Sequence, residues 1–256
     1  MDMLGLSDAA DRNLAAAWTM LGRAAGFDHD VLDSVTVNAS GLPMPFFNGA
    51  FAAGTCSNPA LTIAAMNDFF TARRVPYLLW VRAGGDDRLV EAARAAGLRD
   101  AGGPPLMILP VIEGIPQPPF DLEVRIASTI DELHDHATVV SGGFGMPIEV
   151  ARMLLGPPLL DDPDAAIAIG YARGVPVTTA LLARSGDTAG VYNVATLEEH
   201  RGRGFGEAAT WAVIAEGALR GCTHSVLQSS DAGYPVYTRM GFMDVGRYRQ
   251  LEGPPS

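Results

Sequence analysis

Hydrophobic and polar residues alternate with two different periods along this chain, and each period predicts a different kind of element. In the first half, apolar residues recur at helical spacing in some segments and form short apolar or alternating runs in others, with glycine and proline between them. We predict helices over residues 12–25, 61–74 and 86–96, and strands over 31–39, 46–53, 76–82 and 106–109. The first half is therefore expected to form a compact α/β unit by itself.

The second half begins a new series of elements after a segment rich in proline. Residues 110–120 contain four prolines, which do not fit inside helices or central strands, so this segment is expected to be a semi-rigid connection. We expect two domains, 1–110 and 121–256, joined by a linker at 111–120. Within the second we predict strands over 122–126, 165–173, 175–184, 190–197, 225–228 and 242–250, and helices over 131–141, 148–155, 207–220 and 234–240.

A glycine-rich sequence lies between the predicted strand 190–197 and the predicted helix 207–220. It reads His-Arg-Gly-Arg-Gly-Phe-Gly over residues 200–206. Glycines let the backbone approach an anion closely, and a helix begins with unpaired N–H groups at the positive end of its dipole. Arg201 and Arg203 add donors that match phosphate oxygens. The segment is therefore a candidate phosphate-binding loop, although a plain glycine-rich surface turn is the alternative.

Spacing separates three phosphate-loop patterns that could describe this segment. A Walker loop requires lysine and then serine or threonine after its last glycine, but Gly206 is followed by glutamate and alanine. The dinucleotide fingerprint requires glycine at the sixth position, which is Glu207 when the count starts at Gly202. The third pattern, Arg/Gln-x-x-Gly-x-Gly/Ala, fits Arg201, Gly204 and Gly206 without adjustment.

This third pattern resembles the acyl-CoA-binding loop of the GNAT superfamily of N-acetyltransferases. Residues 233–242, Gly-Tyr-Pro-Val-Tyr-Thr-Arg-Met-Gly-Phe, are also similar to the GNAT motif in which a tyrosine precedes a Gly-Phe pair at the end of the last helix. The order of the predicted elements in the second half, β-α-α-β-β-β-α-β-α-β, is the one expected of a GNAT domain. The resemblance covers residues from about 121 to 252.

The resemblance implies a fold, a reaction and a set of site residues. The fold would be α/β, with a mixed, mostly antiparallel sheet flanked by helices. The reaction would move an acetyl or similar short acyl group from acetyl-CoA to an amine, with Tyr237 protonating the departing thiolate. Ser230 stands where many members of the family have an asparagine that bonds the cofactor. The residues implied to bind acetyl-CoA are Val194, Thr196, Arg201, Gly202, Arg203, Gly204, Phe205, Gly206 and Ser230.

The predicted elements of the first half follow a similar order, but no Arg-x-x-Gly-x-Gly loop precedes the helix at 61–74. The first half therefore resembles a degenerate GNAT copy without a cofactor site, which would give two similar domains in tandem. An unrelated α/β accessory domain is the alternative. A third interpretation makes it a structural or dimerising module, in which case the protein would be a homodimer.

Composition narrows the partners and the location. The net charge of −11 argues against nucleic-acid binding, which requires clustered basic surface. No apolar run approaches the roughly 18 residues of a membrane span and no basic leader precedes an apolar segment, so we expect no membrane partner and a cytoplasmic location. Neither Cys56 and Cys222 nor the histidines have metal-ligand spacing, so no metal is expected.

Three questions stay open from the sequence. The amine acceptor is a small molecule or a peptide, and no general base is assigned. A non-catalytic acyl-CoA sensor with the same fold is the alternative to an enzyme. Residues 142–147, Gly-Gly-Phe-Gly-Met-Pro, are either a mobile substrate loop or a plain connector.

Overall fold

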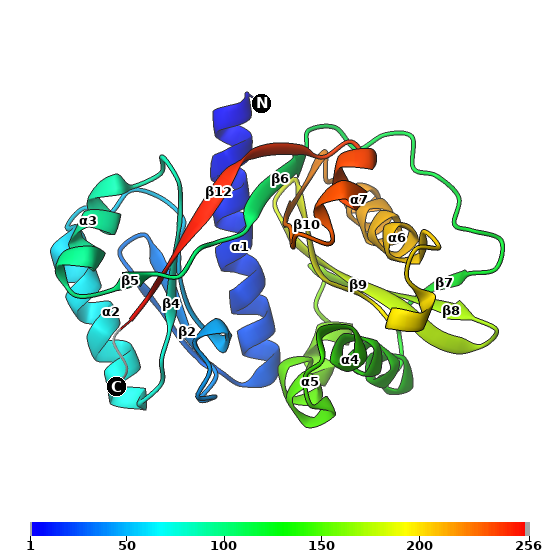
Figure 1. Cartoon of the computed structure of the whole chain (residues 1–256), viewed down its shortest axis with the longest axis horizontal. Helices are drawn as coiled ribbons and strands as arrows, with labels where there is room; N and C mark the ends of the chain where they lie inside the picture. The colour runs from blue at the N-terminus through cyan, green and yellow to red at the C-terminus, as the bar shows by residue number, and fades with distance from the viewer. Residues whose placement is uncertain (1, 254–256) are drawn as a thin grey trace. The chain divides into compact units, whose positions relative to one another are not determined.

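The computed structural model describes residues 2–253, and its contacts divide the chain into two units (Figure 1). The first unit contains the described residues up to Met107, together with Gln228–Ser230 and those from Asp244 onward. The second contains Ile108–Leu227 and Asp231–Met243. The chain thus returns to its first unit at the end, and we describe each unit separately.

The first unit is a sheet of strand order β1-β2-β3-β4-β12, with the short β5 also paired to β12. Neighbouring strands are antiparallel except β3 and β4, which are parallel and joined through a helix. The elements are α1 (Met3–Ala25), β1 (Asp28–Leu32), β2 (Val35–Ala39), η1 (Pro45–Phe47), β3 (Asn48–Ala52), α2 (Pro59–Arg73), β4 (Leu78–Arg82), α3 (Asp87–Ala95), β5 (Arg99–Asp100) and β12 (Met243–Glu252). β6 (Pro105–Leu109) contains the boundary between the units.

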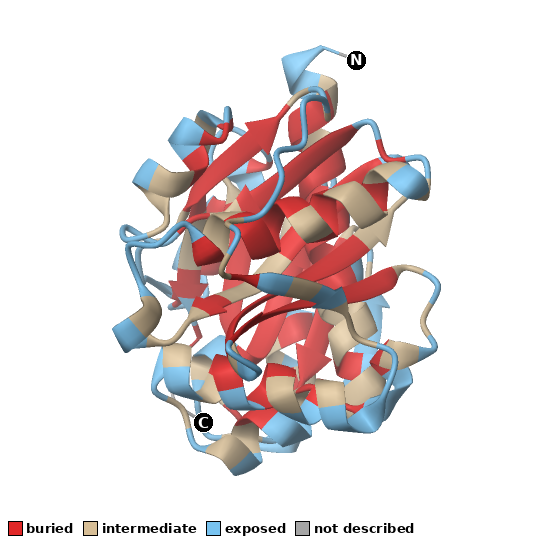
Figure 2. Ribbon diagram, turned by 90° about the vertical axis from the view of Figure 1, so that its right-hand side faces the viewer, coloured by how far each residue is buried: buried red, intermediate tan, exposed pale blue. Residues whose placement is uncertain are grey.

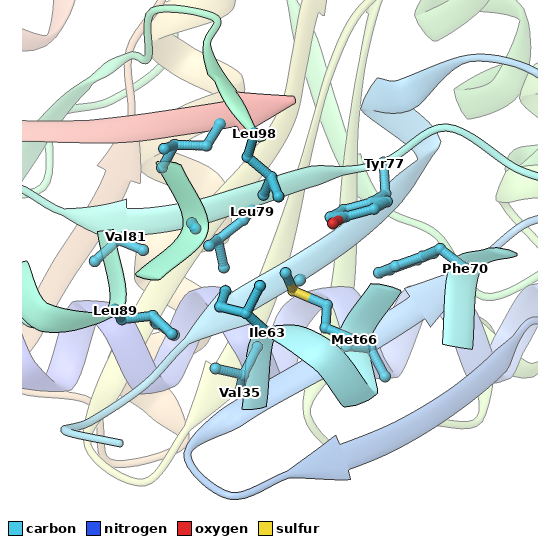
Figure 3. Close-up of a cluster of buried hydrophobic side chains, with 14 of the residues drawn as sticks. Val35, Ile63, Met66, Phe70, Tyr77, Leu79, Val81, Leu89 and Leu98 are labelled. Carbon is cyan, nitrogen blue, oxygen red and sulfur yellow. The ribbon is translucent and has the colours of Figure 1, made fainter. Parts of the chain in front are cut away.

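Helices α2 and α3 bury their apolar sides on one face of this sheet (Figure 3). Alternate strand residues point to the same face, so Leu79 and Val81 of β4 meet Ile63 and Met66 of α2 and Leu89 of α3. Burying each of these large side chains stabilises the fold by about 1.5–3 kcal/mol. This cluster explains why the predicted helices and strands of the first half form one compact unit.

Helix α1 packs on the other face of this sheet, against the strand residues that alternate with those of the cluster in Figure 3. Trp18 of α1 stacks on Phe51 of β3 with ring centroids 5.2 Å apart. Near the start of the helix, Arg82 Nε donates to Asp11 at 2.8 Å and the hydroxyl of Tyr248 donates to the same carboxylate at 2.9 Å. Burial raises the pKa of Asp11 in spite of these partners. The network ties α1 to β4 and β12.

The second unit is a sheet of strand order β11-β10-β9-β8-β7, antiparallel except for the parallel pair β10 and β11. Helices α4 and α6 pack on this sheet, and they cover opposite faces of it (Figure 1). Colouring by burial shows buried strands between helices whose outward sides are exposed (Figure 2). The elements are β7 (Glu123–Ile126), α4 (Ile130–Phe144), α5 (Ile148–Leu154), η2 (Pro157–Leu160), β8 (Ala165–Ala172), β9 (Val175–Ser185), β10 (Thr188–Thr196), η3 (Glu198–His200), α6 (Phe205–Leu219), β11 (His224–Gln228) and α7 (Tyr234–Arg239).

The structure confirms the predicted fold class, a mixed and mostly antiparallel sheet flanked by helices, and differs from the sequence prediction in the following respects, among others. The strand predicted over 31–39 is a hairpin, because Asp33 adopts a left-handed conformation at φ 58° and turns the chain between β1 and β2. The first helix begins at Met3 rather than at residue 12, with the side chain of Asp2 accepting from the Gly5 N–H. The expected second domain, 121–256, does not coincide with the second unit, since β12 pairs with β4 of the first unit.

None of the helices in the described part of the chain combines the length and apolar character needed to cross a membrane. Among residues 2–253, no group of histidine, cysteine, aspartate or glutamate side chains could hold a metal ion.

Candidate active site

The glycine-rich segment forms a tight loop at the start of α6. Gly202 and Gly204 adopt φ values of 75° and 77°, in the left-handed region that favours glycine. Gly204 is the N-cap of α6 and supplies no side chain to satisfy the first helical N–H groups. Within the described residues, the backbone amides of 202–207 donate no hydrogen bond to the protein. The loop therefore presents a row of unsatisfied donors at the positive end of a helix, which suits an anion.

The strand that leads into the loop carries a bulge. Its register with β9 passes from Tyr192 opposite Leu181 to Ala195 opposite Thr179, so two residues of β10, Asn193 and Val194, lie opposite one residue of β9. Asn193 adopts a φ of 49° in this bulge. The kink distorts the strand at the position where the sequence predicts that the main chain of Val194 binds a cofactor.

β10 also diverges from its parallel neighbour. Among the described residues, the register with β11 covers only three pairs, which end at Gly190 opposite Val226. Of the six described residues of β10 beyond Gly190, the four outside the bulge pair with β9, and none of the six pairs with β11. A splayed pair of parallel strands leaves main-chain groups on the open edge, which can accept an extended ligand as a further strand.

Arg201 has partners within the protein. Its Nε donates to the carbonyl oxygen of Thr196 at 3.1 Å and its Nη2 donates to the carbonyl oxygen of Gly143 at 3.2 Å. The guanidinium thus ties the end of β10 to the end of α4. The resemblance implies that Arg201 and the main chain of Thr196 both contact the cofactor. In this structure the two residues are hydrogen-bonded to each other.

Arg203 is paired as well. Its guanidinium forms an ion pair with the carboxylate of Asp121, directly after the proline-rich segment, and lies 4.4 Å from the ring centre of Phe205. Phe205 is buried with Leu122 and Ala208 under the first turn of α6, so its side chain anchors the loop. Gly206 lies close to Thr196, because a Cβ added to Gly206 would be 3.0 Å from the Thr196 hydroxyl oxygen.

Tyr237 lies on α7, and the ion pair between Arg239 of α7 and Glu207 of α6, at 3.9 Å, connects this helix to the first turn after the loop. The side chain is 8% exposed and its ring is 5.8 Å from that of Phe242. Burial raises the pKa of Tyr237 to about 12. Its hydroxyl bonds to no residue in the described part of the chain, so it is a protonated donor available to a ligand.

Ser230 lies between β11 and α7, in the short segment that belongs to the first unit. Its carbonyl oxygen accepts a hydrogen bond from the Ser229 hydroxyl at 2.8 Å. The predicted site residues other than Ser230 all lie in the second unit, on β10, the glycine loop, α6 and α7.

Two glycines of the segment 142–147, expected from the sequence to be either a mobile substrate loop or a plain connector, lie at the end of α4. A Cβ added to Gly142 would be 2.7 Å from a methyl of Leu197, and one added to Gly143 would be 2.7 Å from the Ala195 Cβ. Only glycine allows α4 to approach the end of β10 this closely. Residues 142–144 form the last turn of α4, and Gly145 ends the helix at a φ of 67°. A pair of adjacent glycines at the end of an amphipathic helix is the sequence signal for such an approach.

The second unit also contains a cavity of about 410 Å³. Its lining includes Ile126, Leu159, Asp161, Ile167 and Arg220. Arg220 follows the last residue of α6, so the cavity lies at the end of this helix opposite the glycine loop. A helix of this length separates its two ends by about 22 Å, and the cavity is therefore not part of the candidate site.

The first unit contains a matching connection, in which β3, a loop at 53–58, α2 and the parallel strand β4 follow one another. Here the loop amides are satisfied by carboxylates of the protein. The Cys56 N–H donates to Asp86 at 2.7 Å and the Ser57 N–H donates to Asp33 at 2.6 Å. The side chain of Asn58 caps the helix by accepting from Leu61. Two carboxylates of the protein thus bind the amides of this loop.

Comparison with known proteins agrees with this arrangement. The model of the acetyltransferase (GNAT) family matches residues 152–242, which include β10, the glycine loop and α7. No curated protein sequence matches the chain. A GCN5-related N-acetyltransferase from Kribbella flavida has a similar structure, with a TM-score of 0.74 at 20% identity, over 96% of this chain and 96% of that one.

Two further solved structures extend the comparison. A GCN5-related N-acetyltransferase from Sphaerobacter thermophilus gives a TM-score of 0.59 at 17% identity, over 86% of this chain and 76% of that one. A tandem GNAT protein from the clavulanic acid biosynthesis pathway gives 0.59 at 14% identity, over 87% of this chain and 79% of that one. These structural similarities confirm the GNAT fold, and residues 152–242 are similar to the acetyltransferase (GNAT) family.

Proposed function

We propose that the protein transfers the acetyl group of acetyl-CoA to the primary amine of a small molecule or peptide. The observation that carries this proposal is the row of unsatisfied amides at residues 202–207, next to a strand that is bulged and splayed from its neighbour. The amides would hold the diphosphate of the cofactor. The open edge of β10 would hold the pantetheine arm through main-chain groups, including those of Val194.

The thioester supplies the acyl group in this reaction, and a neutral amine attacks its carbonyl carbon while the carbon–sulfur bond breaks. The contribution of this chain is to position the thioester and to supply a proton to the sulfur. Tyr237 is the proposed donor, because burial raises the pKa of its phenol to about 12 and so keeps the hydroxyl protonated at neutral pH, where it can donate to the thiolate that forms in the transition state. In this proposal the ammonium that forms on attack loses its proton to water.

We further propose that the first unit is a degenerate GNAT copy. In support, three antiparallel strands, a loop, a helix and a parallel strand occur in both units, as β1–β4 with α2 and as β8–β11 with α6. The carboxylates of Asp33 and Asp86 fill the first loop, so it has no room or charge complementarity for a second diphosphate. The protein would therefore bind one acyl-CoA per chain.

Gly204→Glu tests the cofactor site. The substitution places a carboxylate at the unsatisfied amides and forces a residue with a Cβ into the left-handed region, so we expect calorimetry to detect no acetyl-CoA binding. Gly174→Glu is the matched control, because Gly174 has the same φ of 77° and lies exposed in the turn between β8 and β9. Unchanged affinity in Gly204→Glu with a folded protein would contradict the proposal.

An assay of turnover on a panel of amines, measured as the release of free coenzyme A, distinguishes an enzyme from a non-catalytic sensor. Tight binding without turnover on any amine, combined with no effect of Tyr237→Phe, would favour the non-catalytic acyl-CoA-binding protein.

A further inference from the structure

Phe120 is a fully exposed aromatic residue beside the glycine loop. Single exposed apolar residues are common on protein surfaces, so exposure alone assigns no role. The segment that carries Phe120, however, is held in place. The Leu122 N–H donates to the carbonyl oxygen of Pro119 at 3.0 Å, which closes a turn with Phe120 and Asp121 at its tip. The ring thus projects from an ordered turn.

Both neighbours of Phe120 contact the loop or its support. Asp121 forms the ion pair with Arg203, and Leu122 is buried with Phe205 in the cluster under α6. On the other side, a Cβ added to Gly204 would be 3.9 Å from the Pro119 ring. The last residues of the linker pass beside the start of α6 (Figure 1). The backbone of Phe120 is therefore held next to the residues proposed to bind the diphosphate.

The chemistry of the ligand suggests what this ring contacts. In coenzyme A the adenine base is separated from the diphosphate by a single ribose, so the base must lie near the loop that holds the diphosphate. A base has two π faces, and stacking on an aromatic side chain contributes about 1–3 kcal/mol. The turn already orders the backbone of Phe120, so a stacking contact has to order only the two torsions of its side chain.

Resting on the function proposed above, the geometry points to Phe120 as the residue on which the adenine ring of the acyl-CoA stacks. The proline-rich segment is then part of the cofactor site as well as a linker. Asp121 is a positioning residue, because its ion pair with Arg203 fixes the turn without contacting the base.

Calorimetry with two thioesters tests this assignment. Acetyl-CoA carries adenine, whereas S-acetyl-4′-phosphopantetheine lacks the whole adenosine 3′,5′-bisphosphate and keeps only the phosphate next to the pantetheine arm. We expect Phe120→Ala to weaken acetyl-CoA binding by about tenfold, which corresponds to stacking in the lower part of its usual range. Binding of the truncated thioester should not change. Phe120→Trp should keep the affinity of the wild type. Val111→Ala is the control, because Val111 is an exposed apolar residue of the same segment, 56% accessible.

The outcomes are distinguishable from those of the cofactor-site test. Acetyl-CoA affinity that is equal in Phe120→Ala and the wild type would overturn the role of Phe120 and leave the loop assignment intact. An equal loss for both thioesters would also overturn it, because the ring would then act on the shared part of the ligand. A wild type that binds neither thioester would contradict the proposed function itself.

Discussion

Arg201 donates from Nε to the carbonyl oxygen of Thr196, so the loop that follows β10 folds back on the end of the strand. The same guanidinium reaches the carbonyl of Gly143 on α4. Arg201, which the sequence predicts to bind phosphate, therefore also connects the glycine loop to the ends of β10 and α4. We call this pair of hydrogen bonds the Arg201 clamp. The positive charge of Arg201 still adds to the potential at the loop, since neither partner is a carboxylate.

Arg201→Ala should loosen this clamp. We expect a loss of about 1–3 kcal/mol in the free energy of unfolding, because two hydrogen bonds from a charged donor disappear. Chemical denaturation measures the loss, and acetyl-CoA affinity should fall with it. Arg152→Ala on α5 is the matched control, because Arg152 is exposed. Equal stability of the two variants would show that the clamp has no structural role.

Tyr237→Phe should lower kcat by at least tenfold and leave the melting temperature within about 2 °C of the wild type. The hydroxyl has no hydrogen-bond partner in the described part of the chain, so its removal breaks no internal contact. Steady-state kinetics and thermal melting measure the two effects. Tyr171→Phe is the control with the opposite pattern, because the Tyr171 hydroxyl donates to Asp135 at 2.8 Å. A kcat equal to that of the wild type in Tyr237→Phe would show that Tyr237 is not the acid.

The protein should lose stability in mild acid because of His136. This side chain is fully buried on α4, and its Nδ1 donates to the Thr179 hydroxyl oxygen at 2.6 Å, since that hydroxyl donates its own proton to the Ala168 carbonyl. Burial lowers the pKa of His136 to about 3. In the unfolded chain the pKa is about 6.5, so below that pH the unfolded state takes up a proton that the folded state resists.

The contribution of His136 is therefore complete above pH 6.5 and is lost as the pH falls towards 3, by a few kcal/mol. Denaturant unfolding between pH 7 and pH 4 measures the slope. We expect His136→Asn to flatten this slope, although it lowers stability at pH 7 by leaving unfilled space. His134→Asn, on the exposed side of the same helix, should keep the slope of the wild type. A slope that His136→Asn does not change would contradict the assignment.

Asp86→Asn should destabilise the first unit without creating a second cofactor site. The buried carboxylate accepts from the Cys56 N–H at 2.7 Å and from the Leu89 N–H at 3.3 Å, and an amide can accept at only one of its two polar atoms. We expect a loss of about 1–3 kcal/mol. Asp100→Asn, in an exposed ion pair with Arg94, should cost less than 1 kcal/mol. Calorimetry should give one acetyl-CoA per chain for the wild type, and two would contradict the degenerate copy.

The parts of the site that the sequence predicted are those that depend on neighbours along the chain. Gly202 and Gly204 occupy left-handed conformations, and α6 begins directly after them, as the spacing of the motif requires. Tyr237 lies on a short helix that ends before the Gly-Phe pair. Backbone dihedrals are set largely by the residue itself and the next turn of chain, so a local pattern is sufficient to predict them.

The partners of these residues depended on packing between distant segments. Asp121 pairs with Arg203, Gly143 accepts from Arg201, and Asp86 fills the loop at Cys56. The last strand joins β4 of the first unit because its apolar residues complete that core, with Leu251 opposite Leu79. Hydrophobic periodicity fixes which residues of a strand are buried but not which strand lies next to it. By itself the sequence therefore determined the loop, the tyrosine and the fold class, whereas the tertiary structure decided which groups the two arginines contact and which unit the last strand joins.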